Sequence, residues 1–68
     1  MPIVEITLVS GRSAQELRAM ISAVTSAVSE TVAAPVSAIR VIIREVPSTH
    51  FAAGDVTIAE RKHSVPVT

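Results

Sequence analysis

The chain has 68 residues, contains no cysteine, and carries six Lys and Arg against six Asp and Glu. A chain of this length holds one small domain, residues 1–68, and the absence of cysteine excludes disulfides and thiolate metal sites. The balanced charge provides no basic surface for nucleic acid or anionic lipid, and no apolar stretch approaches the roughly 20 residues of a membrane span. We therefore expect a cytoplasmic protein that binds neither nucleic acid nor membrane.

Apolar residues make up 49% of the sequence, yet Phe51 is the only aromatic side chain of the Phe, Tyr and Trp type. A domain this small buries only about 60% of its unfolded surface, so its own core gives marginal stability. The aliphatic surplus predicts that the chain associates with further copies of itself.

Residues 2–9, PIVEITLV, are mostly β-branched or aliphatic and are typical of a strand. Because side chains alternate along a strand, Val4, Ile6 and Leu8 share one apolar face. The other face carries Ile3, Glu5, Thr7 and Val9.

A helix is expected to follow the turn at Ser10–Arg12. Ser13 and Glu16 have the spacing of a capping box, in which each side chain accepts a hydrogen bond from an otherwise unpaired backbone N–H. Apolar residues then recur at spacings of three and four as far as Val32. Pro35 ends the helix because proline lacks the N–H that would continue it.

Residues Ile39–Val46 form the second expected strand, with Arg40, Ile42 and Arg44 on the face away from the helix. Strand, helix and strand make a βαβ unit, so we expect an α/β (α+β) fold with parallel strands and a right-handed crossover. The uncovered sheet face mixes apolar and charged residues, which favours burial against another subunit. Ser48–Ile58 predicts a short C-terminal hairpin, and residues 60–68 predict a weakly ordered tail.

Met1-Pro2 is the first candidate for chemistry. If Met1 is removed, Pro2 presents a free secondary amine, and α-amino groups titrate at about 7.7–8.0 in peptides. Desolvation or a nearby cation lowers that pKa toward neutrality, where a general base works best. The simpler alternative is that Pro2 only begins an edge strand, where its missing N–H is harmless.

Two arginines are the candidate partners of Pro2. Pro2 and Arg12 sit at opposite ends of the first strand, about 30 Å apart at roughly 3.3 Å per residue, so only an antiparallel partner subunit could bring them together. Arg40 opens the second strand and therefore begins near Pro2. Together these groups would bind a carboxylate and stabilise negative charge on an oxygen. Alternatively, Arg12 only decorates the turn, and Arg40 or Arg44 only pairs with Glu5 across the strands.

Other motifs are scarce: the sequence has no Gly-rich phosphate loop, no metal-ligand pair at helical spacing and no Ser-His-acid set. The two histidines, His50 and His63, are expected in a partly exposed loop and in the tail, without a catalytic role.

Several short segments occur at fixed separations between residue 2 and about residue 54. They are Met1-Pro2-Ile3, Leu8–Ser13 (LVSGRS), Ala34-Pro35, Ile39–Glu45 (IRVIIRE) and His50-Phe51 followed by Gly54. Together they resemble the 4-oxalocrotonate tautomerase family of the tautomerase superfamily, and they match its spacing without an apparent gap.

The resemblance implies a hexamer built as a trimer of dimers, with each site shared between subunits. It implies an isomerase, typical of aromatic catabolism, that moves a proton in an unsaturated 2-hydroxy or 2-keto acid such as 2-hydroxymuconate. No metal or organic cofactor is implied. The N-terminal proline, matched by Pro2, is the general base. The arginine matched by Arg12 holds the distal carboxylate, and the one matched by Arg40 engages the 2-oxygen and adjacent carboxylate. The aromatic residue matched by Phe51 forms an apolar wall.

The chain departs from the family pattern at one place, and two alternative functions compete with the tautomerase. Ala52-Ala53-Gly54 stands where the best-known members carry Gly-x-Gly, so we expect a different loop shape and a less bulky wall near Phe51. Relatives that act as hydratases or dehalogenases recruit an additional acid; Glu5 and Glu45 are available, but an ion pair explains Glu5 more simply, so we prefer a tautomerase. The remaining alternative is a non-catalytic subunit of a mixed hexamer, which retention of Met1 would favour.

Overall fold

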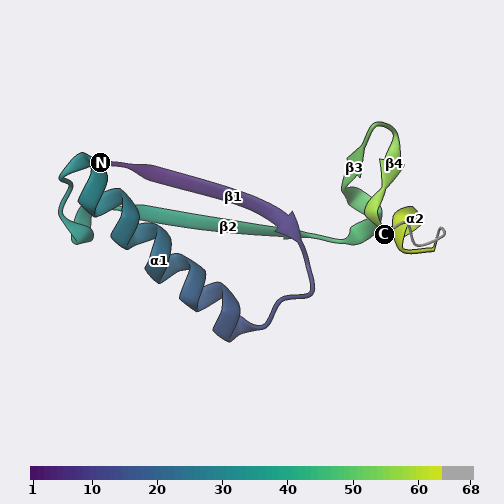
Figure 1. Ribbon diagram of the computed structural model, residues 1–68, viewed down its shortest axis with the longest axis horizontal. Helices are drawn as coiled ribbons and strands as arrows, with labels where there is room; N and C mark the ends of the chain where they lie inside the picture. The colour runs from purple at the N-terminus through teal and green to yellow at the C-terminus, as the bar shows by residue number, and fades with distance from the viewer. Residues whose placement is uncertain (64–68) are drawn as a thin grey trace.

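The computed structural model describes residues 1–63, and Figure 1 shows a two-stranded sheet beside one long helix, with a small arm projecting from the far end of the sheet. The elements, in chain order, are β1 (Ile3–Val9), α1 (Ala14–Val32), the 3-10 turn η1 (Val36–Ala38), β2 (Arg40–Val46), the 3-10 turn η2 (Ser48–His50), β3 (Ala52–Ala53), β4 (Val56–Thr57) and α2 (Ile58–His63).

Strands β1 and β2 pair in parallel, with Ile3 opposite Arg40 and Val9 opposite Val46. The expected alternation is confirmed: Val4, Ile6 and Leu8 of β1 are half-buried, whereas Ile3, Glu5 and Thr7 are exposed. In β2, Val41 and Ile43 are half-buried, and Arg40, Ile42 and Arg44 are exposed. The sheet therefore has one face covered by the helix and one bare face.

Helix α1 begins at the predicted capping box. The Ser13 hydroxyl accepts from the Glu16 N–H at 3.1 Å, and the Glu16 carboxylate accepts from the Ser13 N–H at 2.9 Å. After Val32, Ala33 adopts the left-handed conformation with φ 55°, and Pro35 follows in an extended conformation. Both ends of the helix are thus set by local sequence, as predicted.

A single chain has almost no interior. Among the described side chains only Ile39 is buried, at 8% exposure, while the apolar Ile3 and Ile42 on the bare face are 59% and 42% exposed. The chain exposes 5016 Å², against about 4,100 Å² for a compact protein of this mass. Its radius of gyration is 15.5 Å, whereas a compact domain of this length has about 11 Å. The single chain is therefore more extended and more exposed than a compact domain of its size.

The C-terminal arm, residues 48–63, contains the predicted hairpin. Ala52 pairs with Thr57 and Ala53 with Val56 in antiparallel register. The two turn residues, Gly54 and Asp55, both have positive φ, 62° and 71°. Positive φ at both central residues is the requirement of a two-residue hairpin loop whose twist matches the strands.

The prediction of a weakly ordered tail from Glu60 onward was wrong for residues 60–63, which belong to α2. The physical reason is a second capping box: the Thr57 hydroxyl accepts from the Glu60 N–H at 3.1 Å, and the Glu60 carboxylate accepts from the Thr57 N–H at 2.8 Å. Residues 64–68 of the expected tail lie outside the described residues. No helix in the described part of the chain is long and apolar enough to cross a membrane.

Candidate functional site

The start of the parallel sheet brings Pro2 and Arg40 together along the backbone. The Arg40 N–H donates to the Pro2 carbonyl at 3.0 Å, and Ile3 lies opposite Arg40 in the ladder. The expectation that Arg40 begins near the Pro2 end is therefore confirmed. The short turn η1 supplies this placement, because it delivers the chain from the end of α1 to the first residue of β2.

The two side chains, however, belong to different faces. Pro2 is half-buried and, two residues before Val4, lies on the sheet face that the helix covers. Arg40 is exposed and, two residues before Ile42, lies on the bare face. The Arg40 guanidinium donates through Nη1 to the Ser37 carbonyl at 3.0 Å. A neutral carbonyl is a weaker acceptor than a carboxylate, so this contact leaves Arg40 able to exchange partners with an anionic ligand.

Arg12 lies in the exposed turn between β1 and α1. Figure 1 shows this turn at the end of β1 opposite the N-terminus. Its guanidinium makes no hydrogen bond or ion pair within residues 1–63. One chain therefore holds Pro2 and Arg12 apart by the whole length of the strand. Phe51 also lies beyond the far end of the sheet, because β2 ends at Val46 and the arm continues from there. Pro2 and Arg40 thus lie at one end of the sheet, on different faces, and Arg12 and Phe51 lie at the other end.

The bare face holds one cross-strand ion pair. Arg44 Nη2 lies 3.5 Å from Glu5 Oε2, and both side chains are more than half exposed. Exposed pairs of this kind contribute about 0.2–1 kcal/mol. This is the cross-strand pair that the sequence suggested for Glu5.

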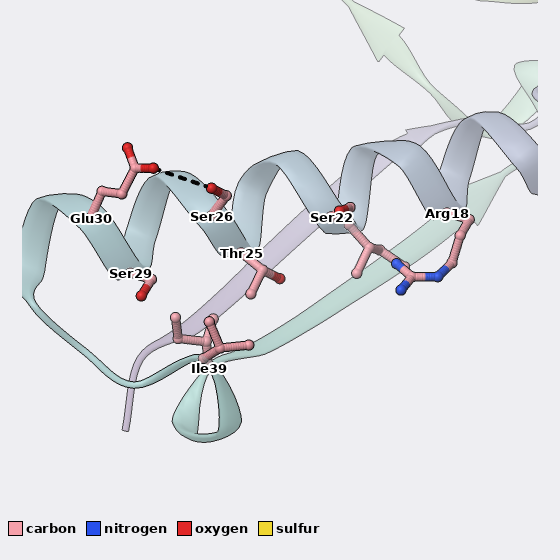
Figure 2. Close-up of a pocket in the computed structure, with 9 residues that line it drawn as sticks. Arg18, Ser22, Thr25, Ser26, Ser29, Glu30 and Ile39 are labelled. Carbon is pink, nitrogen blue, oxygen red and sulfur yellow. Dashed lines mark hydrogen bonds between the residues drawn. The ribbon is translucent and has the colours of Figure 1, made fainter.

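A groove of about 540 Å³ runs between α1 and the start of β2. Figure 2 shows Arg18 toward one end of this helix face and Glu30 toward the other, with Ile39 across from Thr25 and Ser29. Ser26 donates to Glu30 at 3.4 Å. The groove contains none of the four predicted site residues, so this groove and the predicted chemistry do not coincide. This mismatch is expected if the site is completed between subunits.

Among the described side chains, the remaining titratable groups form no second reaction centre. His50 is exposed, and its Nδ1 lies 2.8 Å from the Thr49 hydroxyl; the backbone of His63 belongs to α2. Within residues 1–63, no cluster of three or more His, Asp or Glu side chains could hold a metal ion. Sequence reasoning missed α2, although Thr57 and Glu60 gave the same signal that located α1.

Three kinds of comparison with known proteins, by family, by sequence and by structure, all find similarity to tautomerases. The family described as "Tautomerase enzyme" matches residues 2–61. A 2-hydroxymuconate tautomerase of Stutzerimonas stutzeri is 41% identical over 54 residues, which cover 79% of this chain and 86% of that protein. The crystal structure of TomN, a 4-oxalocrotonate tautomerase homologue in the tomaymycin biosynthetic pathway, superposes with a TM-score of 0.91 at 43% identity, covering 93% of this chain and 97% of TomN. A heterohexamer 4-oxalocrotonate tautomerase from Chloroflexus aurantiacus J-10-fl gives a TM-score of 0.86 at 33% identity, covering 88% and 97%.

Proposed function

The chain belongs to the tautomerase family, and from this premise we propose that it moves a proton within an unsaturated 2-hydroxy or 2-keto acid. Membership of the family makes it a tautomerase, an isomerase by reaction type. The proposed substrate is a dienol such as 2-hydroxymuconate, and the product is the conjugated ketone. Two exposed arginines, Arg12 and Arg40, and the 41% identity to a 2-hydroxymuconate tautomerase support this substrate class.

We assign the general base to Pro2 after removal of Met1. In the unprocessed chain the Pro2 nitrogen is an amide and has no basic lone pair. Met1 is 77% exposed, so the bond that must be cleaved is accessible in the isolated chain. The freed amine would take the proton of the substrate 2-hydroxyl and return it to a carbon of the conjugated chain. The hydroxyl oxygen thereby becomes the ketone oxygen, and Pro2 ends the cycle unprotonated.

The arginines stabilise the charge that forms between the two proton transfers. A dienolate carries negative charge on its 2-oxygen, and a guanidinium aimed at that oxygen lowers the barrier. We place Arg40 there and Arg12 on the distal carboxylate, with Phe51 as the apolar wall. A bound carboxylate or enolate would replace the Ser37 carbonyl as the partner of Arg40.

One observation carries the proposal: the β1–β2 register and strand length place Pro2 and Arg12 at opposite ends of the same chain. The site can form only if a second copy contributes one of them. The bare, partly apolar sheet face and the exposed surface in excess of a compact protein supply the surface for such an assembly. We therefore propose a hexamer with sites shared between subunits.

A second candidate is a non-catalytic subunit of a mixed hexamer. Similarity to a heterohexamer 4-oxalocrotonate tautomerase supports considering it. In that case the chain would retain Met1, or would need a different chain to complete its sites. The two candidates differ in a measurable way, since only the first predicts activity in the chain purified alone.

The test combines intact mass with turnover. We expect the mass to lack one methionine and the processed protein to ketonise 2-hydroxymuconate, with the activity lost in Pro2→Ala. Thr7→Ser, at an exposed position of β1, is the matched control and should retain activity. A processed wild-type protein without turnover on any unsaturated keto acid would refute the catalytic proposal, as would full activity in Pro2→Ala.

A further inference from the structure

Helix α2 is tied to the segment that carries Phe51. The Ile58 N–H donates to the Phe51 carbonyl at 2.9 Å. Arg61 donates through Nη2 to the Ala53 carbonyl at 3.1 Å. These two carbonyls flank Ala52, so α2 holds the backbone on both sides of that residue.

The hairpin requires such support. Strands β3 and β4 contain two residues each, and a short hairpin alone is marginally stable in water. Its turn also places Asp55 at φ 71°, a conformation that side chains other than glycine adopt at some cost. Without α2, the arm would leave the position of the Phe51 ring weakly defined.

Helix α2 is itself well anchored for its length. Glu60 Oε1 accepts from both the Thr57 N–H, at 2.8 Å, and the Thr57 hydroxyl, at 2.9 Å. The bond from the Thr57 N–H, and to a smaller extent the bond from the Thr57 hydroxyl, hold the pKa of Glu60 below its ordinary value. The Glu60 carboxylate is therefore fully charged at neutral pH. The cap begins the helix immediately after β4, which aims Arg61 back across the hairpin at Ala53.

We propose that Arg61 is a positioning residue, which fixes the β3–β4 hairpin through the Ala53 carbonyl and thereby sets the aromatic wall that Phe51 presents to the substrate. The inference rests on the proposed function for the identity of that wall. Its structural part, the link from Arg61 to the Phe51 segment, stands independently. Small errors in the placement of a substrate-contacting group weaken binding and turnover. Loss of the hydrogen bond from Arg61 to the Ala53 carbonyl should therefore change the steady-state kinetics.

The chain offers a clean probe, because Phe51 is its only phenylalanine. Incorporation of 4-fluorophenylalanine gives one ¹⁹F reporter at the proposed wall. The variants are Arg61→Gln, which removes the charge, and Arg61→Lys, which keeps a cationic donor. Arg18→Gln removes another exposed arginine, on α1 and outside the arm, and serves as the matched control.

In Arg61→Gln we expect a shifted or broadened ¹⁹F resonance and a rise in KM of about fivefold, the factor associated with one hydrogen bond of ordinary net strength. We expect kcat to change by less than about twofold because the proton-transfer groups are untouched. Arg61→Lys should restore most of both readouts, and Arg18→Gln should match the wild type.

Unchanged ¹⁹F and KM values in Arg61→Gln would overturn the proposal, and so would a shifted resonance with an unchanged KM. Loss of assembly in Arg61→Gln, measured by sedimentation, would also overturn it in favour of an interface role. If the wild-type enzyme proves inactive, the proposed function fails, but the ¹⁹F comparison still decides whether Arg61 holds the Phe51 segment.

Discussion

If the chain assembles as proposed, dilution should lower its melting temperature, because unfolding then also requires dissociation. The isolated chain exposes 5016 Å², about 900 Å² more than a compact protein of its mass. That excess is close to the roughly 800 Å² per partner of a standard interface. If slightly over half of this excess surface is apolar, its burial in an interface contributes about 13 kcal/mol per chain to stability, at about 25 cal/mol per Å² of apolar area. This is comparable with the whole stability of a small domain.

The expected shift follows from mass action. For six copies that unfold together, tenfold dilution costs about 1.1 kcal/mol per chain. A chain of this length has an unfolding entropy of about 0.14 kcal/mol/K, so the melting temperature should fall by about 8 °C for each tenfold dilution. Thermal unfolding followed by circular dichroism at three protein concentrations, each separated by a factor of ten, measures the melting temperature. A melting temperature independent of concentration, with a monomeric mass, would refute the reasoning.

Three further predictions concern single side chains. Arg12→Ala should raise KM for a dicarboxylate about tenfold or more, whereas Arg40→Ala should lower kcat about a hundredfold; steady-state kinetics showing the reverse would mean that their roles are exchanged. Ser13→Ala removes the α1 cap and should lower the melting temperature by about 7 °C at fixed concentration, from about 1 kcal/mol of lost capping; a melt equal to that of the wild type would mean the cap contributes nothing. Glu60, whose pKa is lowered in the folded chain, stabilises α2 throughout the range above the ordinary glutamate pKa of about 4.3, and this support is lost as pH falls through the lowered value. The Thr57 amide resonance should therefore be constant near neutral pH and move only in acid; movement near neutrality would contradict the assignment.

The parts of the fold that sequence predicted are those set by local rules. Alternation along β1 and β2 identified the covered and bare faces because each strand has one apolar series. The capping box at Ser13 and the proline at position 35 fixed the ends of α1. The hairpin was expected from its turn residues, and Gly54 occupies one of the two positions with positive φ.

Helix α2 escaped prediction because six residues are too few to display a helical period. Its capping pair, Thr57 and Glu60, was the available signal. The site is different in kind. The sequence placed Pro2 beside the start of β2 and Arg40 on the bare face, but the hydrogen bond from the Arg40 guanidinium to the Ser37 carbonyl depends on η1 and was not accessible from spacing.

Subunit mixing tests the central claim most directly. Pro2→Ala chains, which lack the proposed base, and Arg12→Ala chains, which turn over slowly at dicarboxylate concentrations far below their raised KM, are unfolded together and reassembled in equal amounts, with mixed assemblies verified by mass. If Pro2 and Arg12 of one site come from different copies, about a quarter of the sites receive both wild-type residues and recover activity. Activity of verified mixed assemblies no higher than the residual activity of the Arg12→Ala chains would contradict the account, since it would mean that one chain supplies both groups.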